Sequence, residues 1–377
     1  MNQTLYEKIY NKIIEKIISN EYIEGDKLPT ENELALEYDV SRITSKKALD
    51  QLAQNGYIKR IQGKGSYVLE VDDTKLKKNV EINNKKLVHN LDNHLLIGIV
   101  MSDFNSNYGI EILSGMECEL EKNNSFMIVK RSYDDQTIEK KVIKELLNIG
   151  IDGLIIIPVH GEFYNPTILK LILEGFPVVV VDRQLIGIPA SFIGTNNILA
   201  AKNAVDYIFE RGHTNIAFVS APIKNTPLKD RVEGIKKSYF GNGVVWDESK
   251  LWVTNIGEYV HGQEIYENKE QEFQQLLEKI EENPEVTCIF ALEYGIANFI
   301  KKAVKKLGKR VPGDISIMCF DEPKTYTGDP YFTHIKQEEG NIGIGAIKLL
   351  LEQIMNEQKN EKIMMLNTQL IIGETTK

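Results

Sequence analysis

The sequence has few cysteines and histidines, and they are scattered. Its three cysteines, Cys118, Cys288 and Cys319, lie far apart in a chain of 377 residues, so neither a zinc-ligand spacing nor a disulfide framework is visible. Cys288 and Cys319 stand inside apolar runs and are expected to be buried. The six histidines form no metal-binding motif, and we expect neither a metal ion nor a cofactor.

Long apolar runs and a net positive charge are also missing. No apolar run reaches the ~18–20 residues that a membrane-spanning helix needs. The amphipathic N-terminus, dotted with Glu and Lys, does not resemble a signal peptide. We therefore expect a cytoplasmic protein without a membrane partner. The net charge of −9 by itself argues against nucleic-acid binding, because phosphates attract cations.

The charge is unevenly distributed, and one short region is strongly basic. Between Val40 and Gly65 there are six lysines and arginines and one acid, Asp50, which gives a local net charge of 6 − 1 = +5. A phosphate-binding surface depends on local charge, and an acidic remainder can discourage other binding orientations. This region is the first indication of a DNA-binding surface.

The first part of the chain shows the pattern of three helices. Apolar residues recur at helical spacing over 5–19. Thr30 followed by Glu33 forms a capping-box pattern, which predicts a second helix over 31–37. Small apolar residues predict a third helix over 42–54.

A hairpin is predicted directly after these helices. Ser41 is expected to cap the third helix, and Gly56 ends it as a glycine in the left-handed conformation does. Two short strands, over 57–61 and 66–69, enclose a basic glycine-rich turn at 62–65. Three helices followed by a hairpin are the plan of a winged helix-turn-helix, and the basic turn favours the DNA-binding interpretation.

The rest of the chain predicts a linker and a larger α/β unit. Residues 71–94 are polar, without a periodic pattern, and are interpreted as a linker between domains over 1–70 and 95–377. Continuous apolar strands that alternate with helices indicate parallel sheets covered on both faces. About 280 residues are too many for one such sheet, so we expect two lobes with ligands at the strand ends. The predicted strands are 95–101, 126–129, 153–157, 177–181, 216–219, 287–291 and 315–320.

The N-terminal segment closely resembles the GntR family of regulators. This resemblance implies that the third helix enters the major groove, where Arg42 can contact guanine with two hydrogen bonds. The matching segments are 29–35, 40–44, 47–49 and 63–68. The residues expected to contact DNA are Thr30, Glu31, Ser41, Arg42, Thr44, Lys46, Lys47, Gln62, Gly63, Lys64 and Gly65.

The remainder resembles the LacI/GalR effector domain, which is similar to periplasmic sugar-binding proteins. The resemblance implies that Arg231 contacts the sugar ring and that Asp321 accepts hydrogen bonds from sugar hydroxyls. Asp182, at the end of a strand, either touches ligand or orients Arg183. The matching segments are 97–100, 151–155, 181–183, 212–218, 231–234, 311–317 and 320–321.

One departure from the LacI/GalR pattern bears on the ligand. The family has Asn-Asp after its sixth strand, whereas this chain has Glu293-Tyr294. An ionised glutamate only accepts hydrogen bonds. The change therefore favours a sugar with more donors, a ligand with a cationic amine, or a pairing of Glu293 with Arg231. Further candidates for the ligand site are Phe104, Tyr108, Tyr259 and Gln337.

Together these patterns predict a regulator, not an enzyme. A GntR head on a LacI-type body is the architecture of arabinose repressors, although the sugar does not follow from it. We expect a homodimer that binds pseudo-palindromic operator DNA and is released by a small sugar effector. A pyridoxal-phosphate enzyme fusion and a free sugar-binding protein are the alternatives. No Schiff-base lysine context supports the first, and the head argues against the second. Repression and activation cannot be separated from sequence.

Overall fold

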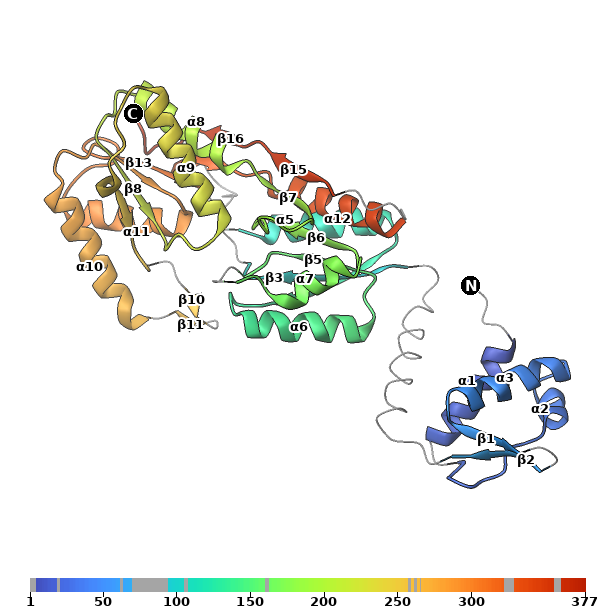
Figure 1. Ribbon diagram of the computed structural model, residues 1–377. Coiled ribbons are helices and arrows are strands. Elements are labelled where there is room, and N and C mark those ends of the chain that lie inside the picture. The colour runs from blue at the N-terminus through green and yellow to red at the C-terminus, as the bar shows by residue number, and fades with distance from the viewer. Residues whose placement is uncertain are drawn as a thin grey trace. The chain divides into compact units, whose positions relative to one another are not determined.

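The computed structural model describes two units of the chain, which lie within residues 1–90 and 91–377. Figure 1 draws the first unit in blue and the second from cyan to red. The linker expected over 71–94 lies outside the described residues, apart from His94. The described residues are 5–18, 21–61, 64–69, 94–104, 108–159, 163–256, 259–260, 263–264, 266–321, 329–355 and 361–377.

The first unit consists of three helices and a hairpin around one apolar core. The helices are α1 (Leu5–Ile18), α2 (Glu31–Glu37) and α3 (Arg42–Gln54). The hairpin pairs β1 (Ile58–Ile61) with β2 (Gly65–Val68) in antiparallel register. The predicted second and third helices have these same bounds, the first strand begins one residue later than predicted, and the second strand begins and ends one residue earlier. The winged helix-turn-helix fold is thus confirmed.

The helix ends of this unit are fixed by the predicted caps. Thr30 Oγ1 accepts a hydrogen bond from the Glu33 backbone N–H at 3.3 Å, and the Glu33 carboxylate accepts one from Thr30 N–H at 2.7 Å. Ser41 Oγ accepts from the Thr44 N–H at 3.2 Å. Gly56, with φ of +76°, allows the chain to turn back into β1. These caps set the direction in which α3 leaves the turn.

The second unit contains two lobes, each built on a six-stranded sheet. In the first lobe all neighbouring strands run parallel. Helices α5 (Ile110–Lys122) and α12 (Glu339–Met355) cover one face, and α6 (Gln136–Ile149) and α7 (Pro166–Leu173) cover the other. The strands in sheet order are β15 (Ile363–Leu366), β7 (Ser191–Thr195), β6 (Val178–Val181), β5 (Gly153–Ile156), β3 (Leu96–Met101) and β4 (Phe126–Arg131).

The second lobe repeats this plan, with one antiparallel strand at an edge. Helices α8 (Asn197–Glu210) and α9 (Thr226–Gly241) cover one face, and α10 (Tyr266–Glu282) and α11 (Tyr294–Lys306) cover the other. The strands in sheet order are β16 (Gln369–Ile371, antiparallel), β14 (Thr333–Lys336), β13 (Ser316–Phe320), β12 (Cys288–Ala291), β8 (Ile216–Ser220) and β9 (Leu251–Val253). Short elements outside this sheet are η1 (Glu248–Lys250), β10 (Tyr259–Val260) and β11 (Gln263–Glu264).

The chain passes between the two lobes at three places in the described residues. It leaves β7 for α8, returns from β14 to α12, and crosses again from β15 to β16. Each lobe is therefore assembled from separate segments of the sequence. The seven predicted strands correspond to β3, β4, β5, β6, β8, β12 and β13, and the two-lobed α/β fold is confirmed.

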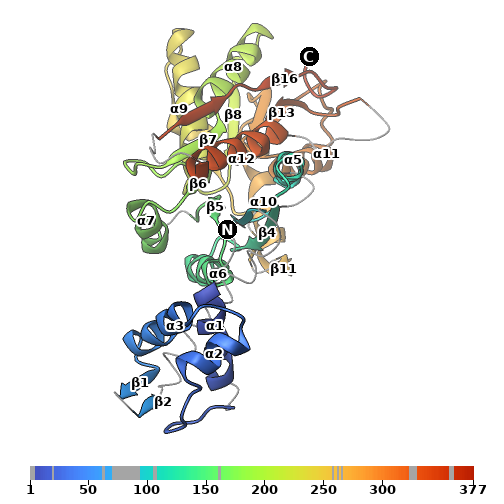
Figure 2. The same ribbon diagram turned by 90° about the vertical axis from the view of Figure 1, so that its right-hand side faces the viewer.

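Two helices of the first lobe pack unusually closely. A Cβ atom at Gly115 of α5 would lie 2.2 Å from the Gly340 carbonyl oxygen of α12. A Cβ at Gly343 of α12 would lie 2.1 Å from the Ile112 carbonyl oxygen of α5. The two helices lie side by side in both views (Figures 1 and 2). Their backbones thus touch directly, without side chains between them.

The burial of the cysteines and the character of the helices were both inferred from the composition. Cys288 and Cys319 are buried, as expected, and Cys118 is exposed. Within the described ranges, no helix has both the length and the apolar character needed to cross a membrane.

Gly234 provides a test of close packing in the second lobe. A Cβ at this position of α9 would lie 2.2 Å from the Ile198 carbonyl oxygen of α8, so the two helices pack closely here. We predict that Gly234→Ala destabilises the protein by about 1–3 kcal/mol, because the helices must move apart. Thermal denaturation measures the effect.

Gly241→Ala is the matched control for this substitution. Gly241 ends the same helix, and a Cβ there would meet nothing within 4 Å. The control should be neutral or slightly stabilising, because alanine favours helix over glycine. Equal melting temperatures for the two variants would contradict the packing argument.

Candidate DNA-binding and effector sites

The N-terminal end of α3 presents polar side chains outward from the first unit. Arg42 is exposed, with 70% of its side-chain surface accessible, and Ser41 and Lys46 are also exposed. The inner face of α3 is buried, and Ser45 Oγ donates to the Glu31 carbonyl oxygen at 2.6 Å. This bond fixes α3 against α2, so the outward residues are presented on a rigid pair of helices.

Glu31 lies at the centre of an ion-pair cluster that joins three elements. Its carboxylate accepts a hydrogen bond from Arg42 Nε at 3.0 Å and another from Arg60 of β1, which also pairs with Asp50. The hydrogen bond from Arg60, followed by that from Arg42, lowers the pKa of Glu31. Sequence reasoning placed Glu31 among the DNA-contacting residues without finding these partners. In the structure its carboxylate holds Arg42 at the start of α3.

The remaining basic residues occupy different surroundings. Lys47 Nζ lies 4.0 Å from the centre of the Tyr6 ring, so this lysine contacts α1. Lys64 is exposed at the hairpin turn, and Gly65 has φ of +119° beside the Lys27 side chain. Gln62 and Gly63, predicted for the same turn, lie outside the described residues.

Sequence reasoning also missed Ile43, which has 79% of its surface exposed on α3. An apolar side chain exposed on such a helix can contact the methyl group of thymine. The sequence could have indicated this exposure. Ile43 stands between Arg42 and Thr44 and does not belong to the apolar face of the predicted helix.

In the second unit, two aspartates occupy corresponding places in the two lobes. Asp182 follows β6 in the first lobe and Asp321 follows β13 in the second, with φ of +63° and +60°. Left-handed backbone is uncommon for residues other than glycine, and it concentrates at functional sites. Tyr108 Oη donates to Asp182 Oδ1 at 2.8 Å, and Gln337 Nε2 donates to Asp321 Oδ2 at 2.9 Å.

Arg231 lies in the second turn of α9. It is buried, with 5% of its surface exposed. Its Nε donates to Asn197 Oδ1 at 2.9 Å and its Nη1 to the Leu292 carbonyl oxygen, and its guanidinium lies 3.7 Å from the centre of the Phe320 ring. Arg231 is thus held rigidly next to the end of β13.

Burial controls the ionisation of Asp321. Loss of solvent raises the pKa of its carboxyl to about 6, although the Arg231 charge and the Gln337 hydrogen bond act in the opposite direction. The Asp182 charge adds to the increase, which places the two aspartates within electrostatic range of each other. The ends of both sheets therefore converge on one acidic region.

Gln337 connects this region to a crossing between the lobes. Its Oε1 accepts a hydrogen bond from Thr195 Oγ1 at 2.6 Å, and Thr195 is the last residue of β7. One side chain thus bonds both to the end of a first-lobe strand and to Asp321 in the second lobe. Gln337, a ligand-site candidate from the sequence, thus links two of the crossings between the lobes, a region that we call the hinge.

Glu339 is a further acid of this region that sequence reasoning did not find. It begins α12, and its carboxylate accepts from the Gly109 backbone N–H at 2.8 Å. Burial, opposed by this hydrogen bond, raises its pKa to about 7. The nearby charges of Asp321 and Asp182 contribute to the increase. Its signal in the sequence was its place two residues after Gln337.

The other predicted ligand residues lie at varied positions. Phe104 is partly buried, and its ring lies 4.0 Å from the Arg131 guanidinium. Glu293 caps α11 and accepts from the Ala221 N–H at 3.4 Å. Tyr259 lies within β10, where only its backbone is described.

Arg183 bears on the alternative role of Asp182. It pairs with Asp134, and this carboxylate holds its guanidinium. Asp182 accepts a hydrogen bond from Tyr108, and its charge also contributes to the raised pKa of Arg183. Its carboxylate therefore acts both on Arg183 and within the acidic region.

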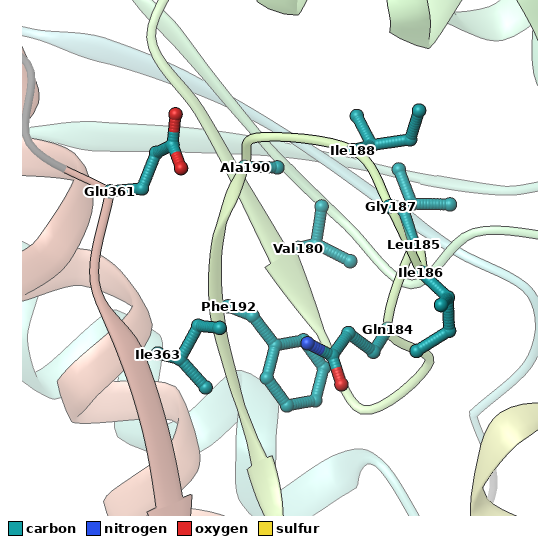
Figure 3. A pocket seen from close by; sticks show the side chains of 10 residues that line it. All are labelled: Val180, Gln184, Leu185, Ile186, Gly187, Ile188, Ala190, Phe192, Glu361 and Ile363. Atoms are coloured by element: carbon teal, nitrogen blue, oxygen red, sulfur yellow. The ribbon is translucent and has the colours of Figure 1, made fainter.

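A separate hollow of about 250 Å³ lies in the first lobe, away from these residues. It opens between the loop over 184–190, β7 and the start of β15, and Figure 3 shows Phe192, Ile363 and Gln184 around it. Its lining is mainly apolar, and it contains none of the eight predicted ligand residues. The acidic region at the hinge is chemically better suited to a polar ligand.

The arrangement at the hinge can bind a molecule rich in hydroxyl groups. The carboxylates of Asp182 and Asp321 offer hydrogen-bond acceptors from both lobes. Arg231 supplies a buried cation, and its contact with the Phe320 ring orients its planar group. A ligand bound to both aspartates would hold the lobes together.

Two relatives match this chain over nearly its whole length. The chain is 24% identical over 364 residues to an arabinose metabolism transcriptional repressor of Halalkalibacterium halodurans, with 95% of this chain and 91% of the relative covered. It is 24% identical over 381 residues to a repressor of the same name from Geobacillus stearothermophilus, with 99% and 97% covered. A solved LacI family transcriptional regulator from Enterococcus faecium, with bound ribose, matches with a TM-score of 0.61 and 22% identity. It covers 74% of this chain and 98% of that chain.

Two family comparisons account for nearly all of the described chain. Residues 5–68 match the bacterial regulatory proteins of the gntR family. Residues 97–366, more than half of the chain, match the periplasmic binding protein domain. The chain therefore belongs to the periplasmic binding protein domain family and carries a GntR-type DNA-binding domain at its N-terminus.

Proposed function

We propose that this chain is a bacterial transcription regulator that binds operator DNA through its first unit and a small sugar through the second. The observation that carries the proposal is the hinge arrangement. Gln337 bonds to Thr195 and to Asp321, so a ligand on Asp321 acts directly on the connection between the lobes. The names of the relatives and the ribose bound in a similar structure support a sugar as the ligand.

The proposal includes a division of labour along the chain. Residues 1–70 form the DNA-binding domain, 71–94 the linker, and 95–377 the effector-binding and dimerisation domain. Two heads related by two-fold symmetry would bind a pseudo-palindromic operator with half-sites about one helical turn apart. Such a regulator acts in the bacterial cytoplasm, where its operator lies.

Repression relieved by sugar is the mode that we propose. The relatives named as repressors support it. The buried groups at the hinge, Arg231 and Asp321, are engaged in fixed contacts that suit binding. We accordingly propose a binding protein without catalytic activity.

The DNA-binding proposal predicts different effects for two basic residues. Arg42→Ala should weaken operator binding by about 1–3 kcal/mol and relax base preference, because Arg42 is held at the start of α3 for base contact. Lys64→Ala should weaken binding to all sequences about equally. Electrophoretic mobility shifts with operator and scrambled DNA measure both. Unchanged affinity and preference in Arg42→Ala would show that α3 does not read the bases.

The effector proposal predicts that Asp321 carries ligand binding. In a thermal-shift screen of L-arabinose, D-ribose and other sugars, a true ligand raises the melting temperature of the full chain. Asp321→Ala should reduce that ligand's affinity roughly tenfold to a hundredfold, as expected for a lost charged hydrogen bond. Operator binding should remain. Asp314→Ala, which removes a partly exposed aspartate paired with Arg310 in the same lobe, is the control. Normal affinity in Asp321→Ala would overturn the hinge site.

The two sites should be coupled with a defined sign. If sugar releases the repressor, then operator DNA must weaken sugar binding by the same factor, typically about 5–150-fold. Calorimetric titration of sugar with and without saturating operator measures this factor. Equal affinities would show uncoupled sites, and tighter sugar binding on DNA would identify the sugar as a co-repressor.

A further inference from the structure

We propose that Glu339 is a proton-binding residue of the effector site, so that effector binding is coupled to proton uptake. The proposal rests on the proposed function, since it concerns the same site. It assigns a role to a residue that sequence reasoning did not select.

Acidic groups reach this site from three elements. Asp182 follows β6 in the first lobe, Asp321 follows β13 in the second, and Glu339 begins α12 directly after the crossing. The partly buried Tyr108 side chain interacts with all three acids. Its hydroxyl donates to Asp182, and loss of solvent, followed by the charges of Asp182, Glu339 and Asp321, raises its pKa. Acids from both lobes thus surround one side chain.

The surroundings of Glu339 are mostly acidic. Its own segment also contains Glu338, which bonds to Asn341 and Gln369. Arg231 acts on Asp321, while Arg183 is paired with Asp134. The charged groups of other elements that act on Glu339 are Asp321 after β13, Glu111 of α5 and Asp182 after β6, and Glu339 in turn acts on Tyr108 before α5. The two arginines of the region act on these neighbours: Arg231 of α9 on Asp321, and Arg183 beside Asp182 and Tyr108.

The proximity of the lobes makes this arrangement sensitive to closure. Asp321 belongs to the second lobe, so its repulsion of Glu339 depends on the distance between the lobes. With the lobes together, the pKa of Glu339 is about 7 and that of Asp321 about 6. Separation admits water and weakens the repulsion, which returns both pKa values toward those of ordinary carboxyl groups.

The raised pKa values of Glu339 and Asp321 determine how pH affects closure of the lobes. Both pKa values are raised in the closed arrangement, so closure binds protons. Closure is unopposed at low pH and becomes less favourable as the pH rises through about 6–7. Because a sugar on both lobes favours closure, its affinity should fall over the same range. A protonated Glu339 can also donate a hydrogen bond, which the aspartates cannot do when ionised.

A purely structural role for Glu339 makes a different prediction. Gly109 caps α5 without a side-chain hydrogen bond, and Glu339 supplies the acceptor for its N–H. If capping were its whole role, ligand affinity would not depend on the protonation of Glu339. Glu339→Gln separates the two roles, because glutamine keeps the size and the acceptor oxygen but cannot titrate.

The experiment uses the full chain with L-arabinose and D-ribose as probes. Calorimetric titrations at pH 6, 7 and 8, in buffers of different ionisation enthalpy, give the affinity and the number of protons taken up. The wild type should lose about tenfold in affinity from pH 6 to pH 8 and take up about half a proton at pH 7, as expected for one group titrating near pH 7.

Glu339→Gln should lose most of this pH dependence and the proton uptake. Glu352→Gln is the matched control, because Glu352 lies on the same helix about 20 Å further along and pairs with Lys362. It should behave as the wild type. A pH-independent wild-type affinity, or equal pH dependence in wild type and Glu339→Gln, would overturn the proposal.

A second measurement separates this proposal from the proposed function. Potentiometric titration of the ligand-free full chain, wild type minus Glu339→Gln, gives the titration of Glu339 itself. Because proton uptake on binding requires a lower pKa before closure, titration of the ligand-free group near the ordinary pKa of about 4.3 supports the proposal. A group that already titrates near pH 7 without ligand overturns it. If neither sugar binds, the ligand class of the proposed function fails, and this titration still decides the role of Glu339.

Discussion

The second unit depends on one constraint, which is that the strand ends of two parallel sheets meet where the chain crosses between lobes. Gln337 bonds to Thr195 at one crossing and to Asp321 at the end of β13. The proposed ligand residue Asp321 and the crossing between the lobes therefore belong to one hydrogen-bonded structure. A polar ligand that replaces or extends these bonds changes the free energy of the hinge directly, and no long pathway inside the unit is required.

In the first unit, Glu31 is the residue that links several elements. A single carboxylate joins α2, α3 and β1 by accepting from Arg42 and Arg60. A partly buried carboxylate with two arginine partners is well paired, whereas removal of one partner would leave charge uncompensated. This cluster explains how a basic surface remains ordered, since the same acid that neutralises part of its charge also orients Arg42.

Much of the fold was readable from the sequence because its signals are local. The caps at Thr30 and Ser41 gave the bounds of α2 and α3, and continuous valine or isoleucine runs marked strands such as β6. β7 and the edge strands β15 and β16 were not predicted. β7 and β16 mix polar and apolar residues, and β15 is a run of four apolar residues that pairs with the distant β7. Asp182 and Asp321 could be predicted as site residues because each directly follows an apolar strand, β6 or β13. Glu339 was not predicted, since its raised pKa depends on burial and on neighbours such as Gly109 and Asp182, which lie more than 150 positions away in the sequence.

The glycine contacts between α5 and α12 have a mechanical consequence. Helices that meet through side chains can slide by changing rotamers, but a contact between backbones allows no such adjustment. The close backbone contacts at Gly115 and Gly343 make the two helices move as one rigid unit. Glu339 begins one of them, and the residue that precedes the other is Gly109. A rotation of α12 at the crossing must therefore also rotate α5. Changes of shape within the first lobe then occur in its loops and not between these two helices.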